Sequence, residues 1–250
     1  MLHSLSIELV YLFCFCLFTV SVLYASIGHG GASGYLAVFI LFGFEMADIK
    51  AQVLLMNCFV AFISFALFFK EKKIAWHLFF PFAIPSIPCS FIGAYIKVDL
   101  FIYKILLGVF LLFSIAYILI SLSKKESKKK EINLPLAIFL GAMIGLASGM
   151  IGIGGGVLLS PLLLIFGWAS IAEIASICAL FIFVNSVSGI FGHLFKGNEI
   201  SFSHVYFVPI VVFGGFLGAY LGSKHYRANG LKFGLCLVLL LACYKCFFDL

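Results

Sequence analysis

Charged side chains are scarce in this sequence. Asp, Glu, Lys and Arg make up only 10% of the 250 residues, while 64% are hydrophobic and the mean hydropathy is +1.22. A typical soluble domain carries about 25% charged residues. Too few polar side chains remain here to cover a water-facing surface. The composition therefore excludes a soluble globular protein and predicts an all-α membrane protein.

Long stretches of the chain contain no charged residue at all. Residues 51–69 and 105–123 are of this kind, and each approaches the ~20 residues that span a bilayer as a helix. Residues 132–172 contain no Asp, Glu, Lys, Arg or His. At ~1.5 Å per residue, one helix of this length would reach about twice the bilayer core. The run must therefore break inside the membrane, and its glycine cluster predicts where.

Sequence landmarks recur at an offset of 124 or 125 residues. The pairs are Gly28–Ala32 with Gly152–Gly156, Leu41–Phe44 with Ile165–Trp168, Pro85 with Pro209, and Phe91–Tyr95 with Phe216–Tyr220. Their order is the same in both halves. We interpret them as an internal duplication, with a first transmembrane repeat over 1–123, a basic cytoplasmic linker over 124–131 and a second repeat over 132–250.

Each half is predicted to contain the same series of helices, the second of which is short. The ranges are 5–27, 32–44, 46–69, 75–96 and 101–122 in the first half, and 133–151, 155–167, 170–195, 203–223 and 229–248 in the second. The short element covers only ~21 Å, so it is re-entrant or completes a crossing with its neighbours. Each repeat thus has four or five crossings.

The distribution of basic residues bears on this choice. Short Lys- and Arg-rich loops face the cytoplasm. Three clusters lie at 70–73, 124–130 and 224–232. Five crossings per half make the repeats inverted and place all three clusters on one side. Four crossings make the repeats parallel, and the basic residues then fit almost as well. We favour the inverted topology.

The two glycine-rich breaks are the strongest candidates for a binding site. Glycine lets the backbone leave helical geometry, and irregular backbone at membrane depth is tolerated where it lines a wet cavity or is buried in protein. A short helix that starts at a break points its unpaired N–H groups towards it, which suits an anion. Small residues also serve close helix packing, which is the alternative role. The candidate residues are Gly28, His29, Gly30 and Gly31 in the first break, and Gly152, Gly154, Gly155 and Gly156 in the second.

Polar side chains near the breaks extend the candidate list. Ser148, Asn57 and Asn185 either contact the substrate or join helices by hydrogen bonds. His29 and His193 are candidate proton relays, because imidazole titrates near neutral pH, or else structural residues. No predicted span carries a central Asp, Glu, Lys or Arg, which argues against a cation pump built on membrane carboxylates.

Several other functions lack their motifs. The glycine clusters have no Gly-Lys-Ser/Thr of a P-loop and no strand–turn–helix setting, so a nucleotide site is not expected. Cys243 and Cys246 stand three residues apart in an apolar stretch without a second pair, so no metal site is expected there. We expect no catalytic residue, no cofactor and no nucleic-acid partner; the oligomeric state stays open.

The second break carries a resemblance to a known family. The motif Gly145-Leu-Ala-Ser-Gly-Met-Ile-Gly-Ile-Gly-Gly-Gly-Val-Leu-Leu-Ser-Pro161, followed by Asn185-Ser-Val-Ser-Gly189, His193, Gly197 and Phe216-Leu-Gly-Ala-Tyr-Leu-Gly222, resembles the sulfite exporter TauE/SafE family. The first half departs from this pattern, with Ala32 in place of the third glycine and Ala37 in place of Pro161.

The resemblance implies transport of small anions such as sulfite, sulfonates or related organic anions, driven by ion gradients rather than ATP. The sequence therefore predicts a secondary transporter, an exporter in the bacterial inner membrane, with proton coupling left open. Two alternatives remain: a passive anion channel, and a rhomboid-like intramembrane serine protease built on Gly31-Ala-Ser33-Gly34 with His193 as base.

Overall fold

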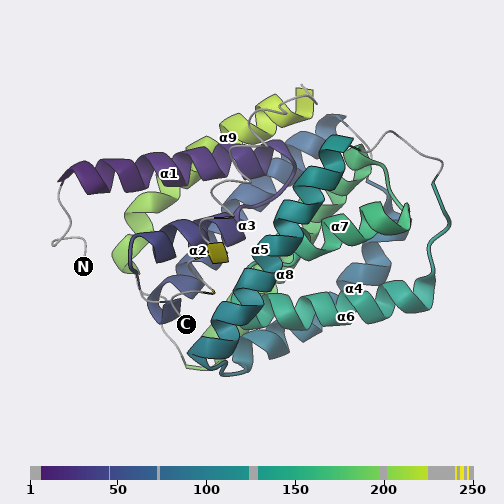
Figure 1. Cartoon of the computed structure of the whole chain (residues 1–250). Coiled ribbons are helices and arrows are strands. Elements are labelled where there is room, and N and C mark those ends of the chain that lie inside the picture. Colours follow the sequence, from purple (N-terminus) through teal and green to yellow (C-terminus); the bar gives the residue numbers. More distant parts are fainter. Residues whose placement is uncertain are drawn as a thin grey trace.

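The computed structural model describes residues 7–44, 46–71, 74–123, 129–197, 202–224 and the single positions 240, 243, 244 and 247. Within these residues the chain is helical and contains no strand. The elements in Figure 1 are α1 (Ile7–Ser26), α2 (Ala32–Leu41), α3 (Met46–Glu71), α4 (Trp76–Tyr95), α5 (Leu100–Ser123), α6 (Leu134–Ile151), α7 (Gly156–Phe166), α8 (Ile171–Phe195), the 3₁₀ helix η2 (Phe202–Phe207) and α9 (Val208–Lys224).

The all-helical prediction is confirmed, and within the described residues six helices are long and apolar enough to cross a membrane. One predicted helix differs at its start. Instead of a continuous helix over 203–223, the chain forms η2 and then α9. Pro209 stands in the first turn of α9, where its missing N–H would be unpaired in any case. The predicted helix at 229–248 and linker residues 124–128 lie outside the described residues.

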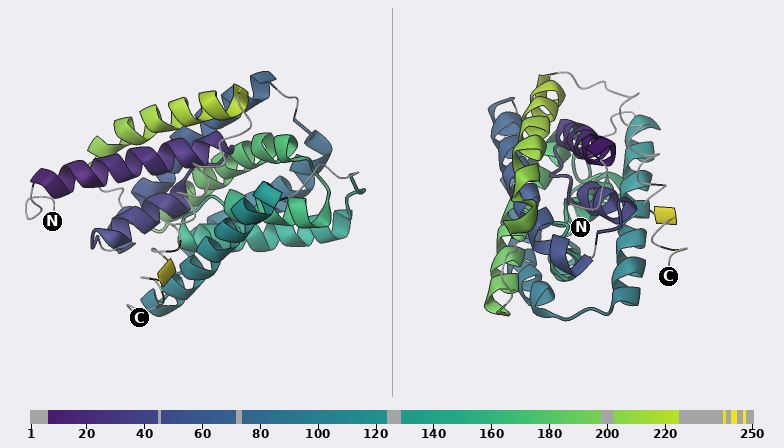
Figure 2. Two further views of the ribbon diagram at one scale, coloured as in Figure 1. Left: turned by 45° about the horizontal axis from the view of Figure 1, so that its top comes forward. Right: turned by 90° about the vertical axis from the view of Figure 1, so that its left-hand side faces the viewer.

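Helix directions follow from which residues face one another. In α4 and α6, Ser86 faces Gly145 and Ser90 faces Gly149, so the numbers rise together and the helices are parallel. By the same reasoning α1 is parallel to α9, since Val22 faces Gly218 and Ser26 faces Gly222. Figure 2 shows α1 and α9 side by side in both views.

The two halves meet through α3 and α8, which are antiparallel. Phe62 packs on Phe183 with tilted rings whose centroids are 5.4 Å apart, and Leu54 faces Gly189. In contrast, α4 is parallel to α8, as its Ile87 carbonyl accepts from Ser188. Helices α4, α6 and α8 therefore run opposite to α3.

The direction of α1 completes the topology. Phe13 near its start stacks on Phe44, which precedes α3, at 5.3 Å. Gly30, beyond its end, lies against Asn57 in the middle of α3. Hence α1 runs parallel to α3. Helices in equivalent positions of the two halves (α1 and α6, α3 and α8, α4 and α9) all run in opposite directions, which is the arrangement of an inverted topology.

In two helix pairs, a helix of one half packs closely on a helix of the other half. A Cβ atom on Gly93 of α4 would overlap the carbonyl of Leu146 in α6, and one on Gly218 of α9 would overlap the carbonyl of Val22 in α1. Gly93 and Gly218 are equivalent positions of the two halves, and so are Val22 and Leu146, at the offset of 124 or 125 residues that relates the sequence landmarks. Small residues allow helix backbones to approach in this way. The common ancestry of the halves stays a prediction.

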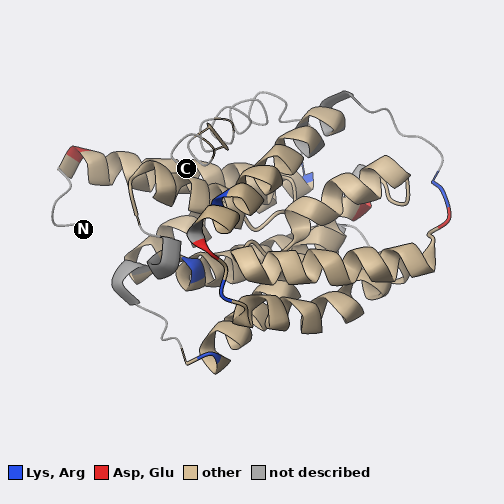
Figure 3. Cartoon of the chain, turned by 60° about the horizontal axis from the view of Figure 1, so that its bottom comes forward, with Lys and Arg blue, Asp and Glu red and all other residues tan. Residues whose placement is uncertain are grey.

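The described charged residues gather at the two ends of the bundle, and most of the helical surface is uncharged (Figure 3). We call one end of the bundle the Lys129 end. It holds the last turns of α3, α5 and α9 and the first turns of α6 and α8. Lys129 pairs there with Glu173 at 2.7 Å. The opposite Lys196 end holds the last turns of α4 and α8 and the first turns of α1, α3 and α5.

Candidate functional site

The two breaks lie in equivalent positions, each between a long helix and a short one that turns back. Gly31 is the N-cap of α2 and Gly155 the N-cap of α7. Gly155 has φ +75° and Gly31 has φ +99°, a backbone region that side chains with a Cβ rarely adopt. The glycines are therefore required for the helix to restart in a new direction.

Asn57 of α3 joins the two breaks. Its Oδ1 accepts a hydrogen bond from the backbone N–H of Ala32 at 3.1 Å, and its Nδ2 donates to Ser186 Oγ of α8 at 2.8 Å. Gly30 lies against the Asn57 amide, and a Cβ on Gly154 would lie 2.5 Å from Asn57 Nδ2. Both breaks therefore reach the same side chain, near the middle of α3.

A second connection runs from the first break to α7. His29 Nε2 and Ser160 Oγ are 2.6 Å apart, and His29 Nδ1 lies 3.1 Å from the Ile27 carbonyl. Ser160 Oγ also lies 2.7 Å from the Gly156 carbonyl. The ring therefore ties the first break to the first turns of α7.

The N-termini of the two short helices differ in their capping. Both N-caps are glycines without a capping side chain, but Asn57 Oδ1 accepts from Ala32 at the start of α2, whereas no described side chain accepts from the first N–H groups of α7. The first N–H groups of a helix have no partner within it. Beside the start of α7, the hydroxyl of Ser148 is buried and has no hydrogen-bond partner. Ser148 lies next to Gly155, because a Cβ there would be 3.4 Å from that of Ser148. The second break thus combines the positive end of a helix with an unpaired hydroxyl.

The remaining glycines of the candidate list lie against other helices. Gly28 approaches the backbone of α8 at Ala175, Gly152 ends α6 and lies against the Lys50 side chain, and Gly156 lies against Ile182. Their close contacts fit the packing role as well as a binding role.

The structure separates the two remaining polar candidates from the centre of the site. Asn185 is held by α4: Ser86 Oγ donates to its Oδ1 at 2.7 Å and Ser90 Oγ to its carbonyl at 3.1 Å. His193 lies in the last turn of α8, two turns beyond Ser186. Ser33, the serine of the protease alternative, pairs with the Tyr24 hydroxyl at 2.8 Å. Asn185 is thus a helix-joining amide in this state, and His193 lies at the Lys196 end.

The residues at the centre are closed off from the surroundings. His29, Asn57, Ser148, Ser160 and Ser186 all have exposed fractions of 2% or less. In this structure the two breaks therefore form a closed centre, and of the two short helices only α2 has a side-chain acceptor at its start among the described residues.

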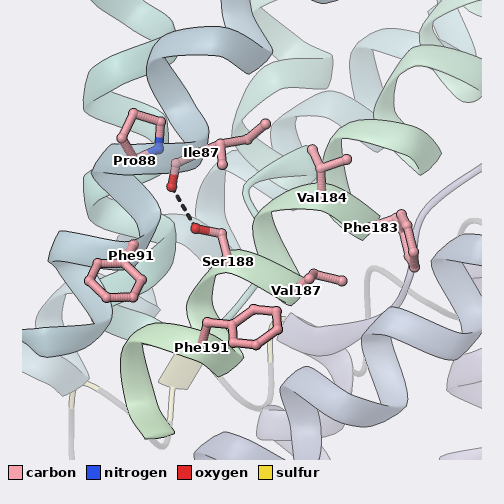
Figure 4. A pocket seen from close by; sticks show the side chains of 8 residues that line it. All are labelled: Ile87, Pro88, Phe91, Phe183, Val184, Val187, Ser188 and Phe191. Atoms are coloured by element: carbon pink, nitrogen blue, oxygen red, sulfur yellow. Dashed lines mark hydrogen bonds between the residues drawn. The ribbon is translucent and has the colours of Figure 1, made fainter. Parts of the chain in front are cut away.

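A groove of about 500 Å³ lies elsewhere, between α4 and α8 (Figure 4). Its lining is apolar apart from Ser188, whose hydroxyl donates to the Ile87 carbonyl at 2.6 Å. Such a lining offers no free polar group to an anion, so the groove does not belong to the candidate site. Within the described residues there is also no cluster of three or more metal-ligating side chains.

Two residues of the site escaped the sequence analysis. Ser186 follows Asn185 directly, and a single serine in an apolar helix gives no separate sequence signal. Lys50 precedes the charge-free run that begins at Ala51, but it lies in the second turn of α3, and its ammonium donates to the Met150 carbonyl at 2.6 Å. Helical spacing from Asn57 was the available signal, because Lys50 and Asn57 are two turns apart on one face.

Comparison with known proteins agrees with this architecture. The chain is 32% identical over 232 residues to the probable membrane transporter protein y4hK of Sinorhizobium fredii (strain NBRC 101917 / NGR234), covering 91% of this chain and 94% of that protein. No solved structure matches the chain. Residues 13–246 match the family described as Sulfite exporter TauE/SafE. With six apolar helices of spanning length in its described part, the chain is a multi-pass membrane protein, and it belongs to the TauE/SafE family of membrane transporters.

Proposed function

We propose that the protein is a secondary transporter that exports a small anion, such as sulfite or a sulfonate, across the bacterial inner membrane by alternating access around the two breaks. The observation that carries the proposal is the meeting of both breaks at Asn57, beside the uncapped start of α7. Amide donors and the positive end of a helix stabilise an anion without a charged side chain.

Ser148 adds a donor at the same place. A buried hydroxyl without a partner loses roughly 1–3 kcal/mol relative to a paired one. A bound anion would supply the missing acceptor for Ser148 Oγ. The closed state therefore retains unpaired donors that a substrate oxygen would satisfy, which favours a binding site over a purely packed break.

Closure of the centre supports a carrier rather than a channel that stays open. In a carrier the central site faces one side of the membrane at a time, and a closed state lies between the two. The inverted directions of equivalent helices supply two similar access routes, one through each half. We place no enzymatic activity in this centre, because Ser33 and His193 belong to different regions of the bundle.

The test compares two glycines with almost the same backbone conformation. Gly154 has φ +72° and would place a Cβ 2.5 Å from Asn57, whereas Gly167, at the other end of α7, has φ +70° and no atom nearer than 3.9 Å. Gly154→Ala and Gly167→Ala therefore share the backbone cost of about 1–2 kcal/mol. In proteoliposomes with ³⁵S-labelled sulfite and taurine, we expect saturable flux that only Gly154→Ala abolishes. Wild-type flux in Gly154→Ala, or no saturable flux of any anion in the wild type, contradicts the proposal.

A further inference from the structure

A series of basic side chains leads from the Lys196 end towards the centre. Lys97 is exposed after α4, and Lys196 caps the end of α8. The charges of Lys97 and Lys196 act on each other, and burial together with the Lys97 charge lowers the pKa of Lys196. In the antiparallel pair α3 and α8, Asn57 bonds to Ser186 and Leu54 faces Gly189, so the same register sets Lys50 opposite His193. Four basic groups from three helical regions therefore gather at one place.

Lys50 is the innermost member and touches the second break itself. Its ammonium donates to the Met150 carbonyl in the last turn of α6, and its side chain lies against Gly152. Along one face of α3, positions 50, 54 and 57 follow each other at helical spacing. The face thus runs from Lys50 past Leu54 to Asn57, while the break runs beside it from Gly152 to Gly154.

Leu54 separates the ammonium from the centre. Its side chain is 1% exposed and lies between Gly152 of the break and Gly189 of α8. An anion that moves from Lys50 to Asn57 along this face must displace Leu54. The stretch therefore has a charged outer part, an apolar barrier and a polar inner site in that order.

We propose that Lys50, His193 and Lys196 form an anion-attracting access path that leads from the Lys196 end to the central site, with Leu54 as its barrier in the closed state. This inference rests on the proposed function. The focused field of the lysine charges near a low-dielectric wall concentrates anions at this end of the path, whichever way they cross. Lys50 then exchanges its bond to the Met150 carbonyl for a charge-assisted bond to the anion.

The alternative role of Lys50 is purely structural, because a lysine near a helix C-terminus satisfies its last carbonyls. The two roles differ in what they do to the apparent affinity. A structural lysine alters the melting temperature of the protein but leaves KM and its salt dependence unchanged. A lysine of the access path alters KM, and the effect weakens as salt screens the charges.

The experiment measures ³⁵S-sulfite flux in right-side-out and inside-out membrane vesicles. For Lys50→Met we expect KM to rise about tenfold or more, the size expected for a lost charged hydrogen bond, and more in the vesicles that present the Lys196 end to the label. Lys50→Arg keeps the charge and is expected to restore most of the affinity. Lys70→Gln changes the same residue type at the other end of α3 and is expected to leave KM unchanged in the vesicles that present the Lys196 end.

Because Lys50→Met removes a bond to α6 and could impair folding, a second variant uses the exposed Lys97 and the half-buried Lys196. The double variant Lys97→Gln, Lys196→Gln is expected to raise KM about threefold at low ionic strength, and about 0.5 M KCl should abolish the difference from wild type. Wild-type KM in both this variant and a folded Lys50→Met protein overturns the access path while leaving the transporter intact. Absence of saturable flux in the wild type overturns the function and the path together.

Discussion

Asn57 uses the two ends of one amide for two different halves of the molecule. Its oxygen accepts from Ala32 in the first break, and its nitrogen donates to Ser186 in the second half. An amide offers an acceptor and two donors, so this residue type suits a position between an N–H group and a hydroxyl. A movement of either break must therefore change the hydrogen bonds of Asn57.

Asn57→Asp tests this position with little change in shape. The carboxylate can still accept from Ala32, and Ser186 can donate to it, but its negative charge repels an anion at the start of α7. We expect sulfite binding to weaken at least tenfold, measured as the concentration that gives half-maximal thermal stabilisation of the purified protein. Asn133→Asp, which changes the exposed N-cap of α6, is the control and should bind as the wild type does. Unchanged affinity in Asn57→Asp would argue against a central site.

His29 is placed to accept a proton without losing its partners. In the neutral ring, Nδ1–H donates to the Ile27 carbonyl and Nε2 accepts from Ser160. In the protonated ring Nε2 donates to Ser160, whose own hydrogen then goes to the Gly156 carbonyl. Both charge states therefore have complete hydrogen bonding, which is what a proton relay needs.

His29→Gln tests for proton coupling. Glutamine can keep one bond to Ser160 but cannot take up a proton near neutral pH. We expect the variant to exchange labelled for unlabelled sulfite while losing the stimulation of flux by an imposed pH gradient. His193→Gln, at the Lys196 end, should retain that stimulation. Wild-type stimulation in His29→Gln would assign the coupling to another group.

At the scale of helices, close contacts of glycines in one half with helices of the other half hold the two halves together. Gly93 and Gly218 each lie directly on a backbone carbonyl of the other half, at Leu146 and Val22. Gly189 differs, because a Cβ there meets only side-chain atoms at ordinary van der Waals distance, 3.5 Å or more. The three glycines therefore form a test of packing.

Gly93→Ala and Gly218→Ala must push two helix axes apart, which we expect to cost about 1–3 kcal/mol each. The reduced stability should appear as a lower melting temperature of the detergent-purified protein. Gly189→Ala should melt near the wild-type temperature. If only one of Gly93→Ala and Gly218→Ala destabilised the protein, the two halves would not pack in the equivalent way described above.

The helices were predictable from sequence to within a few residues, because charge-free runs, glycine clusters and basic loops mark their ends. The start of α9 was not predictable. The hydrophobic pattern of residues 202–207 does not distinguish a 3₁₀ helix from the first turn of an α-helix. The glycine breaks were also found correctly as interruptions, between α1 and α2 and between α6 and α7.

The composition of the site was predictable only in part. Composition pointed to Asn57, His29 and Ser148 as polar residues in apolar surroundings. Their partners Ser186 and Ser160 lie 129 and 131 residues away in the sequence, so only the packing of α3, α7 and α8 reveals them. The sequence likewise does not show which of the two short helices lacks a cap, because this depends on whether Asn57 accepts from the start of α2 or of α7.

For the molecule as a whole, helix directions place the three basic sequence clusters, 70–73, 124–130 and 224–232, next to the same end of the bundle. Lys70, Lys129, Lys130 and Lys224 belong to these clusters, whereas Lys50, Lys97, Lys104 and Lys196 stand singly towards the opposite end. Because basic loops face the cytoplasm, we expect the Lys129 end to be cytoplasmic. The start of α1 and the mouth of the access path then face the other side, where an exporter releases its anion.

Reporter fusions test this orientation. Alkaline phosphatase, which is active only outside the cytoplasm, is expected to be active when fused after Asp99 and inactive when fused after Lys130. A green fluorescent reporter at the same two points should give the reverse pattern. Phosphatase activity after Lys130 would reverse the orientation, and with it the side on which the access path opens.

The central claim is that both breaks form one anion site at the start of α7, and selenite tests it most directly. Selenite has the shape and charge of sulfite, and its selenium scatters X-rays anomalously. In crystals of the protein soaked with selenite, the claim predicts an anomalous peak within hydrogen-bond reach of Asn57, Ser148 or the first N–H groups of α7. A peak confined to the groove between α4 and α8 or to the protein surface, or no peak at saturating selenite, would contradict it.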